Sequence, residues 1–234
     1  MTRRFLAIAA HPDDLDFGAA GTTATLTAAG DEVVYCLVTD GDAGGFDNTI
    51  SRDEMGRIRR REQTAAAAVV GVTELHFLGV SDGRVVADLE LRRLLSRVIR
   101  QVRPDVVLSQ SPVRNFDRIF ASHPDHLAAG EATLAAVYPD SRNEFAHPEL
   151  LNVEGLEPHE VPEVWLMGGP DPDHFVDISE TIDQKVQALL CHESQHREPG
   201  RLPAMIREWS MHTAAVAGLP EGRLAEGFRR IKTS

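Results

Sequence analysis

Two short segments of the sequence carry histidine and aspartate in patterns suited to binding a metal ion. The first is His11-Pro12-Asp13-Asp14, directly after an apolar run. Pro12 holds the chain extended at His11, and the adjacent aspartate side chains diverge in the turn that follows. One carboxylate could therefore bind a metal beside His11 while its neighbour reaches a water molecule. Pro-Asp-Asp also forms ordinary turns and helix caps, so this segment alone supports a purely structural role equally well.

The second segment, Ser122-His123-Pro124-Asp125-His126, repeats the same order of residue types. Pro124 suits the first position of a helix, which places Asp125 and His126 in the first turn and His123 just before it. His123 and His126 are three positions apart and can face a common point. A helix capped by Ser122 would explain Pro124 and Asp125, but not two histidines at this spacing.

Together the two segments offer a ligand set for one zinc ion per chain. His11, Asp14 and His126 would supply two imidazoles and one carboxylate, and three protein ligands with one open position are typical of catalytic zinc. Such an ion stays net positive, so it can acidify a water molecule and polarise a carbonyl group. Asp13 is then placed as general base, and His123 could stabilise an oxyanion or protonate a leaving amine. The predicted reaction is hydrolysis of an amide.

The elements that must position these residues alternate along the chain. Strand-like apolar runs occupy residues 5–10, 32–41, 74–80, 105–112 and 163–169, and helical patterns occupy residues 18–29, 54–71, 89–102 and 124–138. This alternation predicts βαβ units, with a mostly parallel sheet covered by helices on both faces in a single domain, residues 1–234. Ligands of such sheets lie beyond the carboxyl ends of the strands. Both histidine segments fall there, on one rim.

Composition excludes several classes of function. The net charge of −12 is spread along the 234 residues, whereas binding to nucleic acid or an anionic membrane needs clustered Lys and Arg. The exception, "RIRRREQ" at residues 57–63, is predicted to be the solvated face of a helix. The distant cysteines Cys36 and Cys191 form no zinc-thiolate or disulfide motif and indicate a reducing compartment. No segment approaches the roughly 20 apolar residues of a membrane span, so we expect a cytoplasmic protein without nucleic-acid or membrane partners.

Four segments resemble one known family. "AHPDD" (residues 10–14) and "HPDH" (123–126) are similar to motifs of the PIG-L/LmbE zinc-dependent de-N-acetylases, which include N-acetylglucosaminylphosphatidylinositol deacetylases and enzymes of mycothiol and bacillithiol metabolism. "KVQALLCHESQ" (185–195) resembles the family's C-terminal segment. Residues 59–83 resemble its helix, third strand and Asp-Gly turn. The similarity therefore covers nearly the whole chain in the right order.

The resemblance implies a Rossmann-like fold and assigns roles to the residues of both motifs. It makes His11, Asp14 and His126 the zinc ligands, Asp13 the base and His123 the group that stabilises the transition state. Its substrate would be a small N-acylated molecule, and an assembly of several copies of the chain stays open.

Other residues are weaker candidates for support or substrate contact. Asp125 is expected to orient a neighbouring histidine. The family often reads "HPDDE", whereas this chain has Leu15 and then Asp16, so the glutamate's role either passes to Asp16 or is lost. The remaining candidates are Asp42, Asp82, Arg114, Asn115 and His192. Each has a local alternative: acidic turns are common after strands, the residues before the second motif can order their loop, and a histidine at a helix end can be a cap.

Three functions remain open on the sequence alone. One is an N-deacetylase acting on an amino sugar or its conjugate; another is the same machinery acting on a different amide, such as a thiol conjugate or a specialised metabolite. The third is a Rossmann-like module that binds a nucleotide without a metal. That module should have a glycine-rich phosphate loop, but "HPDDLDFG" places four acidic or imidazole side chains before its first glycine. The loops at residues 112–121 and 139–162 are expected to shape the pocket, and the helix at 202–217 and His76 are expected to serve packing.

Overall fold

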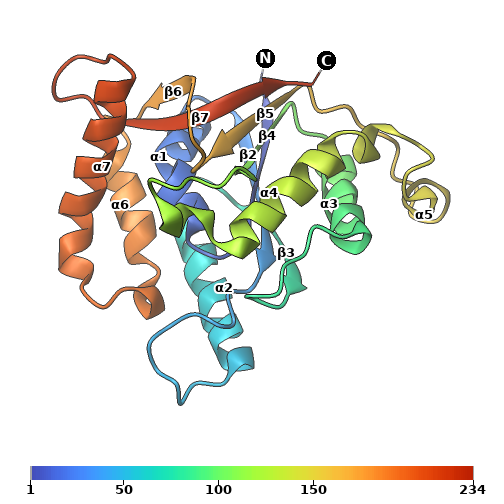
Figure 1. The fold of residues 1–234 in the computed structure, drawn as a ribbon, viewed down its shortest axis with the longest axis horizontal. Coiled ribbons are helices and arrows are strands. Elements are labelled where there is room, and N and C mark those ends of the chain that lie inside the picture. Colours follow the sequence, from blue (N-terminus) through green and yellow to red (C-terminus); the bar gives the residue numbers. More distant parts are fainter. Residues whose placement is uncertain (1, 234) are drawn as a thin grey trace.

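The computed structural model describes residues 2–233 and places seven strands in one sheet, in the order β3-β2-β1-β4-β5-β7-β6 (Figure 1). The strands are β1 (Arg4–Ala9), β2 (Glu32–Thr39), β3 (Glu74–Val80), β4 (Val106–Gln110), β5 (Glu163–Met167), β6 (His174–Asp177) and β7 (Ala225–Lys232). Strands β1 to β5 run parallel, and β7 pairs antiparallel with both β5 and β6. The predicted mostly parallel α/β sheet is confirmed, and β6 and β7 are additions to it.

Helices cover both faces of the sheet. They are α1 (Asp14–Ala28), α2 (Arg52–Val69), α3 (Leu89–Val102), α4 (Pro124–Val137), α5 (Pro148–Asn152), α6 (Ile182–Leu190) and α7 (Leu202–Val216). Alternate side chains of β1, such as Phe5 and Ala7, pack under α1, α2 and α6, while Leu6 and Ile8 pack under α3 and α4 (Figure 1). Because both faces are buried, β1 is a continuous apolar run.

Helix α1, which begins the site, is held from the far end of the chain. Glu226 on β7 accepts hydrogen bonds from the backbone N–H groups of Gly21 (3.1 Å) and Thr22 (2.7 Å). Lys185 on α6 pairs with the same carboxylate at 2.5 Å and is also buried. A buried carboxylate needs such partners to stay charged, so this contact fixes α1 against α6 and β7.

Three sequence-based expectations need correction. Residues 57–63 are not uniformly solvated, because Arg59 and Gln63 of α2 are buried against the turn that follows β1. His76 is not a core residue: it lies on the edge strand β3 and pairs with Glu74 at 3.0 Å, half-exposed. Residues 139–162 are more than a loop, since they contain α5. Among residues 2–233, no helix is long and apolar enough to cross a bilayer.

Candidate active site

The turn after β1 and the start of α4 bring three ligand atoms together. The Nδ1 atom of His11 lies 3.2 Å from Nε2 of His126 and 3.2 Å from Oδ2 of Asp14. The Nε2 atom of His126 lies 3.0 Å from Oδ1 of Asp14. The two histidine segments therefore meet at one rim of the sheet, as predicted, because β1 and β4 are neighbouring strands.

Hydrogen bonds on the far side of each ring set its orientation. The Nε2 atom of His11 faces Oδ2 of Asp125 at 3.2 Å and Oδ1 of Asp82 at 3.1 Å. The Nδ1 atom of His126 faces the carbonyl oxygen of Ala121 at 3.2 Å. These acceptors favour a proton on the outer nitrogen of each ring, so in the neutral rings the inner nitrogens present lone pairs to each other. Metal-binding histidines are held in this way by carboxylates and carbonyls.

The three residues fit a small divalent cation. In a tetrahedral zinc site with bonds near 2.05 Å, ligand atoms lie about 3.3 Å apart, close to the separations between His11, Asp14 and His126. Two neutral rings whose lone pairs face each other at 3.2 Å repel unless a proton or a metal ion lies between them. The donor set of two imidazoles and one carboxylate suits zinc, and His11, His123 and His126 also lie within reach of a single ion.

The charges around His11 favour a cation at this point. Burial opposes protonation of His11, but Asp14, Asp125 and Asp82 overcome it and raise its pKa to about 12. Burial also disfavours ionisation of Asp14, yet His126 and His11 hold the pKa of this carboxyl well below its ordinary value. The buried carboxylates therefore stay ionised and create a negative potential that a proton or a metal ion can neutralise.

Asp13 lies beside the ligands in a constrained backbone conformation. Its φ of 90° is in the left-handed region, which non-glycine residues seldom adopt. Helix α2 holds this turn: Gln63 accepts the Asp13 backbone N–H at 2.9 Å, and Arg59 contacts the Asp13 carboxylate at 3.2 Å as well as the Pro12 carbonyl. Burial raises the pKa of Asp13 to about 6, partly opposed by Arg59. Asp14, in contrast, faces the two histidines, so the adjacent carboxylates do diverge.

Asp16 does not reach the ligand atoms. Its Oδ2 atom lies 2.8 Å from Nε2 of His192 and accepts a hydrogen bond from Gln63 at 2.9 Å. Asp16, Gln63 and His192 are all fully buried. A chain of hydrogen bonds therefore runs from His192 through Asp16 and Gln63 to the backbone of Asp13. His192 is consequently not a helix cap, the alternative reading of this position.

His123 lies beside the ligand cluster and is exposed to solvent. Its ring centroid lies 5.1 Å from that of His11 and 5.4 Å from that of His126. Its Nδ1 atom accepts the backbone N–H of Asp125 at 3.2 Å, which caps α4 and leaves Nε2 as the donor of a neutral ring. Burial, reinforced by His11 and His126, lowers the pKa of His123. His123, rather than Ser122, thus caps the helix.

The remaining candidates fall into two groups. Asp82 contacts His11 directly, whereas Asp42 binds Arg52 at 2.5 Å and the backbone N–H of Asp82 at 2.8 Å, and so supports the turn. Arg114 donates to the carbonyl of Ser122, and Asn115 accepts the backbone N–H groups of residues 117 and 118. The last two residues order the loop that precedes α4.

Gly130 determines how closely α4 approaches β4. A Cβ atom at this position would lie 2.3 Å from the carbonyl oxygen of Gln110 and 2.9 Å from the nitrogen of Pro112. Only a glycine lets the helix cross the end of the strand at this separation. The close approach brings the first turn of α4, and with it His126, next to β1.

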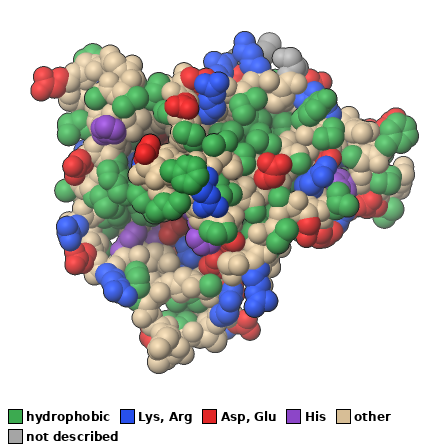
Figure 2. Space-filling model, viewed as in Figure 1, with side chains coloured by type: hydrophobic (Ala, Val, Ile, Leu, Met, Phe, Trp, Pro, Cys, Tyr) green, Lys and Arg blue, Asp and Glu red, His purple; other side chains and the backbone are tan. Residues whose placement is uncertain are grey.

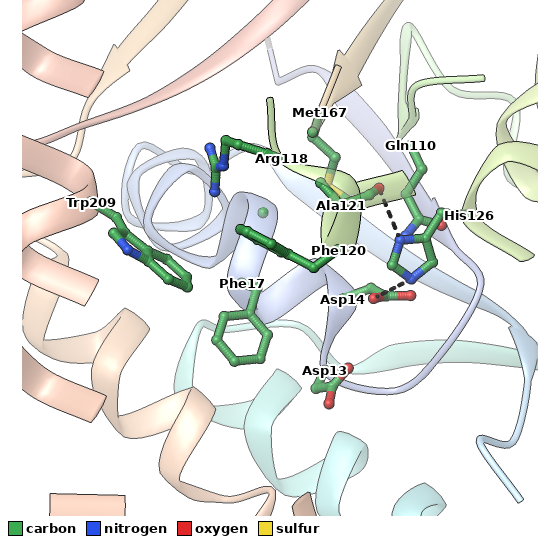
Figure 3. A pocket seen from close by; sticks show the side chains of 12 residues that line it. Asp13, Asp14, Phe17, Gln110, Arg118, Phe120, Ala121, His126, Met167 and Trp209 are labelled. Carbon is green, nitrogen blue, oxygen red and sulfur yellow. Dashed lines mark hydrogen bonds and ion pairs between the residues drawn. The ribbon is translucent and has the colours of Figure 1, made fainter. Parts of the chain in front are cut away.

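A cavity of about 320 Å³ opens beside the ligand cluster. It is lined by Asp13, Asp14, Phe17, Gly18, Gln110, Arg118, Phe120, Ala121, His126, Met167, Gly168 and Trp209. Figure 3 shows Asp14 and His126 facing each other at one end, with Phe17, Phe120 and Trp209 at the other. On the face of the molecule seen in Figure 2, histidine, acidic and basic side chains gather in a hollow, near hydrophobic side chains.

Residues 112–121 line the cavity as expected, through Arg118, Phe120 and Ala121, but none of its described lining residues comes from 139–162. The sequence reading missed Trp209, because α7 has the apolar pattern of a packing helix. It also missed Arg59 and Gln63, which are hidden in a charged run. Their spacing of four, one helical turn, was the available signal that both face the same neighbour.

A Rossmann-like α/β sheet whose carboxyl edge carries a His-Asp-His metal site beside a buried carboxylate has the arrangement of a metal-dependent hydrolase. The sequence model of the family described as PIG-L, GlcNAc-PI de-N-acetylase, matches residues 6–137. The chain belongs to this family of deacetylases, which hydrolyse an amide bond, and this contradicts the reading of a non-enzymatic binding module.

Characterised proteins match over nearly the full chain. The diacetylchitobiose deacetylase of Thermococcus kodakarensis is 35% identical over 98% of this chain and 83% of its own length. A 1D-myo-inositol 2-acetamido-2-deoxy-alpha-D-glucopyranoside deacetylase of a Mycobacterium species is 28% identical, over 96% and 87%. The structure of the N,N'-diacetylchitobiose deacetylase of Pyrococcus horikoshii, bound to an inhibitor, superimposes with a TM-score of 0.90 at 29% identity, covering 98% of this chain and 84% of that one.

Proposed function

We propose that residues 1–234 act as a single zinc-dependent deacetylase domain that removes the N-acetyl group from a small N-acetylglucosamine-containing saccharide. The observation that carries the proposal is the convergence of His11 Nδ1, His126 Nε2 and the Asp14 carboxylate, with separations of 3.0–3.2 Å between the two nitrogens and from each nitrogen to a carboxylate oxygen. The proposal takes His11, Asp14 and His126 as the ligands of one ion per chain. Zinc bound there would supply Lewis acidity, lowering the pKa of a water molecule and polarising the amide carbonyl.

The chain's own residues move the protons. Asp13, with a pKa raised to about 6 by burial, accepts a proton from the attacking water and stays mostly ionised at neutral pH. Arg59 keeps its carboxylate oriented at 3.2 Å. His123 donates from Nε2 to the developing oxyanion or the departing amine, because its Nδ1 is occupied by the backbone of Asp125. Asp125 and Asp82 hold His11 from behind.

The substrate class follows from the relatives and from the cavity. The relatives named above act on diacetylchitobiose and on an acetamido-glucopyranoside of inositol, so N-acetylglucosamine is the shared unit. A cavity of about 320 Å³ is at the small end of the ~300–1,000 Å³ range of ligand pockets, which suits one sugar ring with its acetamide. A free small molecule in the cytoplasm, rather than a membrane lipid, is the substrate we propose.

Release of acetate from defined substrates tests this function. Zinc-loaded protein is incubated with N-acetylglucosamine, N,N'-diacetylchitobiose and N-acetylglucosaminyl-inositol, and free amine and acetate are measured. We expect turnover that a chelator abolishes and that zinc restores. Turnover of an N-acylated thiol conjugate, with no turnover of the sugars, would instead support the alternative amide substrate.

A further inference from the structure

We propose that Trp209 and Phe120 form a subsite for a second sugar ring, next to the ring whose acetamide reacts. This inference rests on the proposed function and assigns a role to two aromatic residues outside the metal-binding and proton-transfer groups. It makes the protein a deacetylase of N-acetylglucosamine disaccharides or longer saccharides, in preference to the monosaccharide.

The two ends of the cavity differ in chemistry. Asp13, Asp14 and His126 form the polar end of the cavity, and the reacting amide must lie against them. The opposite end is formed by aromatic side chains that come from separate elements, Trp209 from α7 and Phe120 from the turn before α4 (Figure 3). A substrate that reaches from one end to the other therefore needs a polar amide and a flat apolar face.

The size of the cavity determines which part of a substrate meets the aromatic side chains. Its volume of about 320 Å³ is at the small end of the ~300–1,000 Å³ range of ligand pockets. A cavity of this size suits one acetamido sugar. Phe120 and Trp209 line the cavity with part of their surface, and 64% of Phe120 and 39% of Trp209 remain exposed, so a second ring that extends out of the cavity meets them.

The aromatic pair is held in place in advance of a ligand. The rings of Phe120 and Trp209 are nearly parallel, with centroids 6.2 Å apart and an interplanar angle of 21°. The guanidinium of Arg118 lies 5.3 Å from the centroid of Phe120 and 5.7 Å from that of Trp209. Phe17 supports Trp209 from the cavity side at 6.5 Å. Cation–π and aromatic contacts of this kind restrict the rings, which lowers the entropic cost of binding.

A pyranose ring suits this surface better than other occupants do. The face of an aromatic ring is electron-rich, and one face of a β-linked pyranose presents C–H groups of partial positive charge. The same ring keeps its hydroxyls at the edge, where the exposed rim leaves them in water. A long acyl chain would gain most from a closed apolar channel, and the exposure of Phe120 and Trp209 argues against one.

Substrate length is the direct test of the subsite. We expect the wild-type zinc enzyme to show a higher kcat/KM for N,N'-diacetylchitobiose than for N-acetylglucosamine. Trp209→Ala and Phe120→Ala should each lower the ratio of the two values by about tenfold, which corresponds to about 1.4 kcal/mol of lost binding. Trp209→Phe, which keeps an aromatic face, should restore most of the ratio. Phe145→Ala, an exposed aromatic residue outside the cavity, is the matched control and should leave the ratio unchanged.

A binding measurement separates the subsite from catalysis. The chain has two tryptophans, and Trp165 is buried, so a change in fluorescence on adding sugar reports on Trp209. Titration of N,N'-diacetylchitobiose into Asp13→Asn should shift the emission more strongly than titration of N-acetylglucosamine does, and equal shifts with the two sugars would contradict the subsite.

The failures of the two proposals are distinguishable. Absence of sugar deacetylation by zinc-loaded wild type would overturn the proposed function. Deacetylation with equal kcat/KM for both sugars, or a ratio unchanged in Trp209→Ala, would overturn the subsite alone. A larger decrease of kcat/KM in Trp209→Ala for N-hexanoylglucosamine than for diacetylchitobiose would show that the aromatic pair binds an acyl chain. That result would also refute the sugar subsite.

Discussion

Asp16 and His192 pair inside the protein, with Oδ2 and Nε2 2.8 Å apart and neither side chain exposed to solvent. The pair lies one hydrogen bond from Gln63, which in turn holds the left-handed backbone of Asp13. An acidic residue one position later than in the common family motif thus supports the turn from behind and does not face the ligands. The departure from the motif leaves the ligand set intact.

The Asp16–His192 pair predicts a pH dependence of stability. Burial lowers the pKa of His192, but Asp16, with help from Asp13 and against Arg59, raises it above the ordinary value of 6.5. A raised pKa stabilises the fold fully below pH 6.5, and this stabilisation is lost as pH rises through the folded-state pKa. His192→Gln should therefore cost about 1.5–3 kcal/mol of unfolding free energy at pH 6 and less at alkaline pH. Urea unfolding of both proteins in chelator measures the difference; a cost that grows with pH would contradict it.

Replacing Asp13 should separate metal binding from catalysis. Asp13→Asn removes the base but leaves His11, Asp14 and His126, so the protein should bind zinc normally while kcat falls by about 10²–10⁴-fold. Metal analysis and acetate release on the same preparation measure both. The assignment of the two aspartates would be reversed if Asp13→Asn lost zinc and Asp14→Asn kept it.

Asp125 should tune metal affinity without touching the ion. Its carboxylate contacts Nε2 of His11 and accepts the backbone N–H groups of Gly83 (2.7 Å) and Val85 (3.3 Å). Asp125→Asn should weaken zinc binding by about 10–100-fold, as measured by competition with a chromophoric chelator. Asp173→Asn, which removes an ion pair with Arg229 outside the cavity, is the control and should keep wild-type affinity.

The close approach of α4 to β4 predicts a strong effect of one methyl group. Gly130→Ala would place Cβ 2.3 Å from the Gln110 carbonyl, so the helix must shift, at a cost of about 1–3 kcal/mol, and take His126 with it. Both melting temperature and zinc affinity should fall. Gly56→Ala, in a helix where the added Cβ meets nothing nearer than 3.4 Å, should be neutral or stabilising. Equal effects of the two substitutions would refute the packing argument.

Local pattern predicted most of what positions the ligands. The apolar runs at β1 and β4 and the Pro124 helix start are short-range signals, and parallel topology then brings their carboxyl ends to one rim. Strand β7 could not be predicted in the same way, because Arg229 and Arg230 interrupt its apolar residues. Those arginines are tolerated since they pair across the sheet, with Asp173 and Glu163.

The rest of the site depends on long-range contacts that no local pattern encodes. Gln63 is an unremarkable polar residue in a charged helix until α2 packs against the turn after β1. Trp209 lies in a helix whose apolar pattern is that of a packing helix. Only the folded structure shows that it stacks on Phe120 and lines the cavity. His192 is recognisable as important from the resemblance, but its partner Asp16 is 176 positions away.

His11 and His126 are 115 positions apart in the chain, yet an ion shared between them would tie β1 to α4 as a removable cross-link. Because only the folded chain brings these atoms together, binding adds to the free energy of unfolding by mass action, about 4 kcal/mol when the free ion exceeds its dissociation constant a thousandfold. The stability of the protein is then set partly by its surroundings: the same chain would unfold more readily in a zinc-poor medium than in a zinc-rich one.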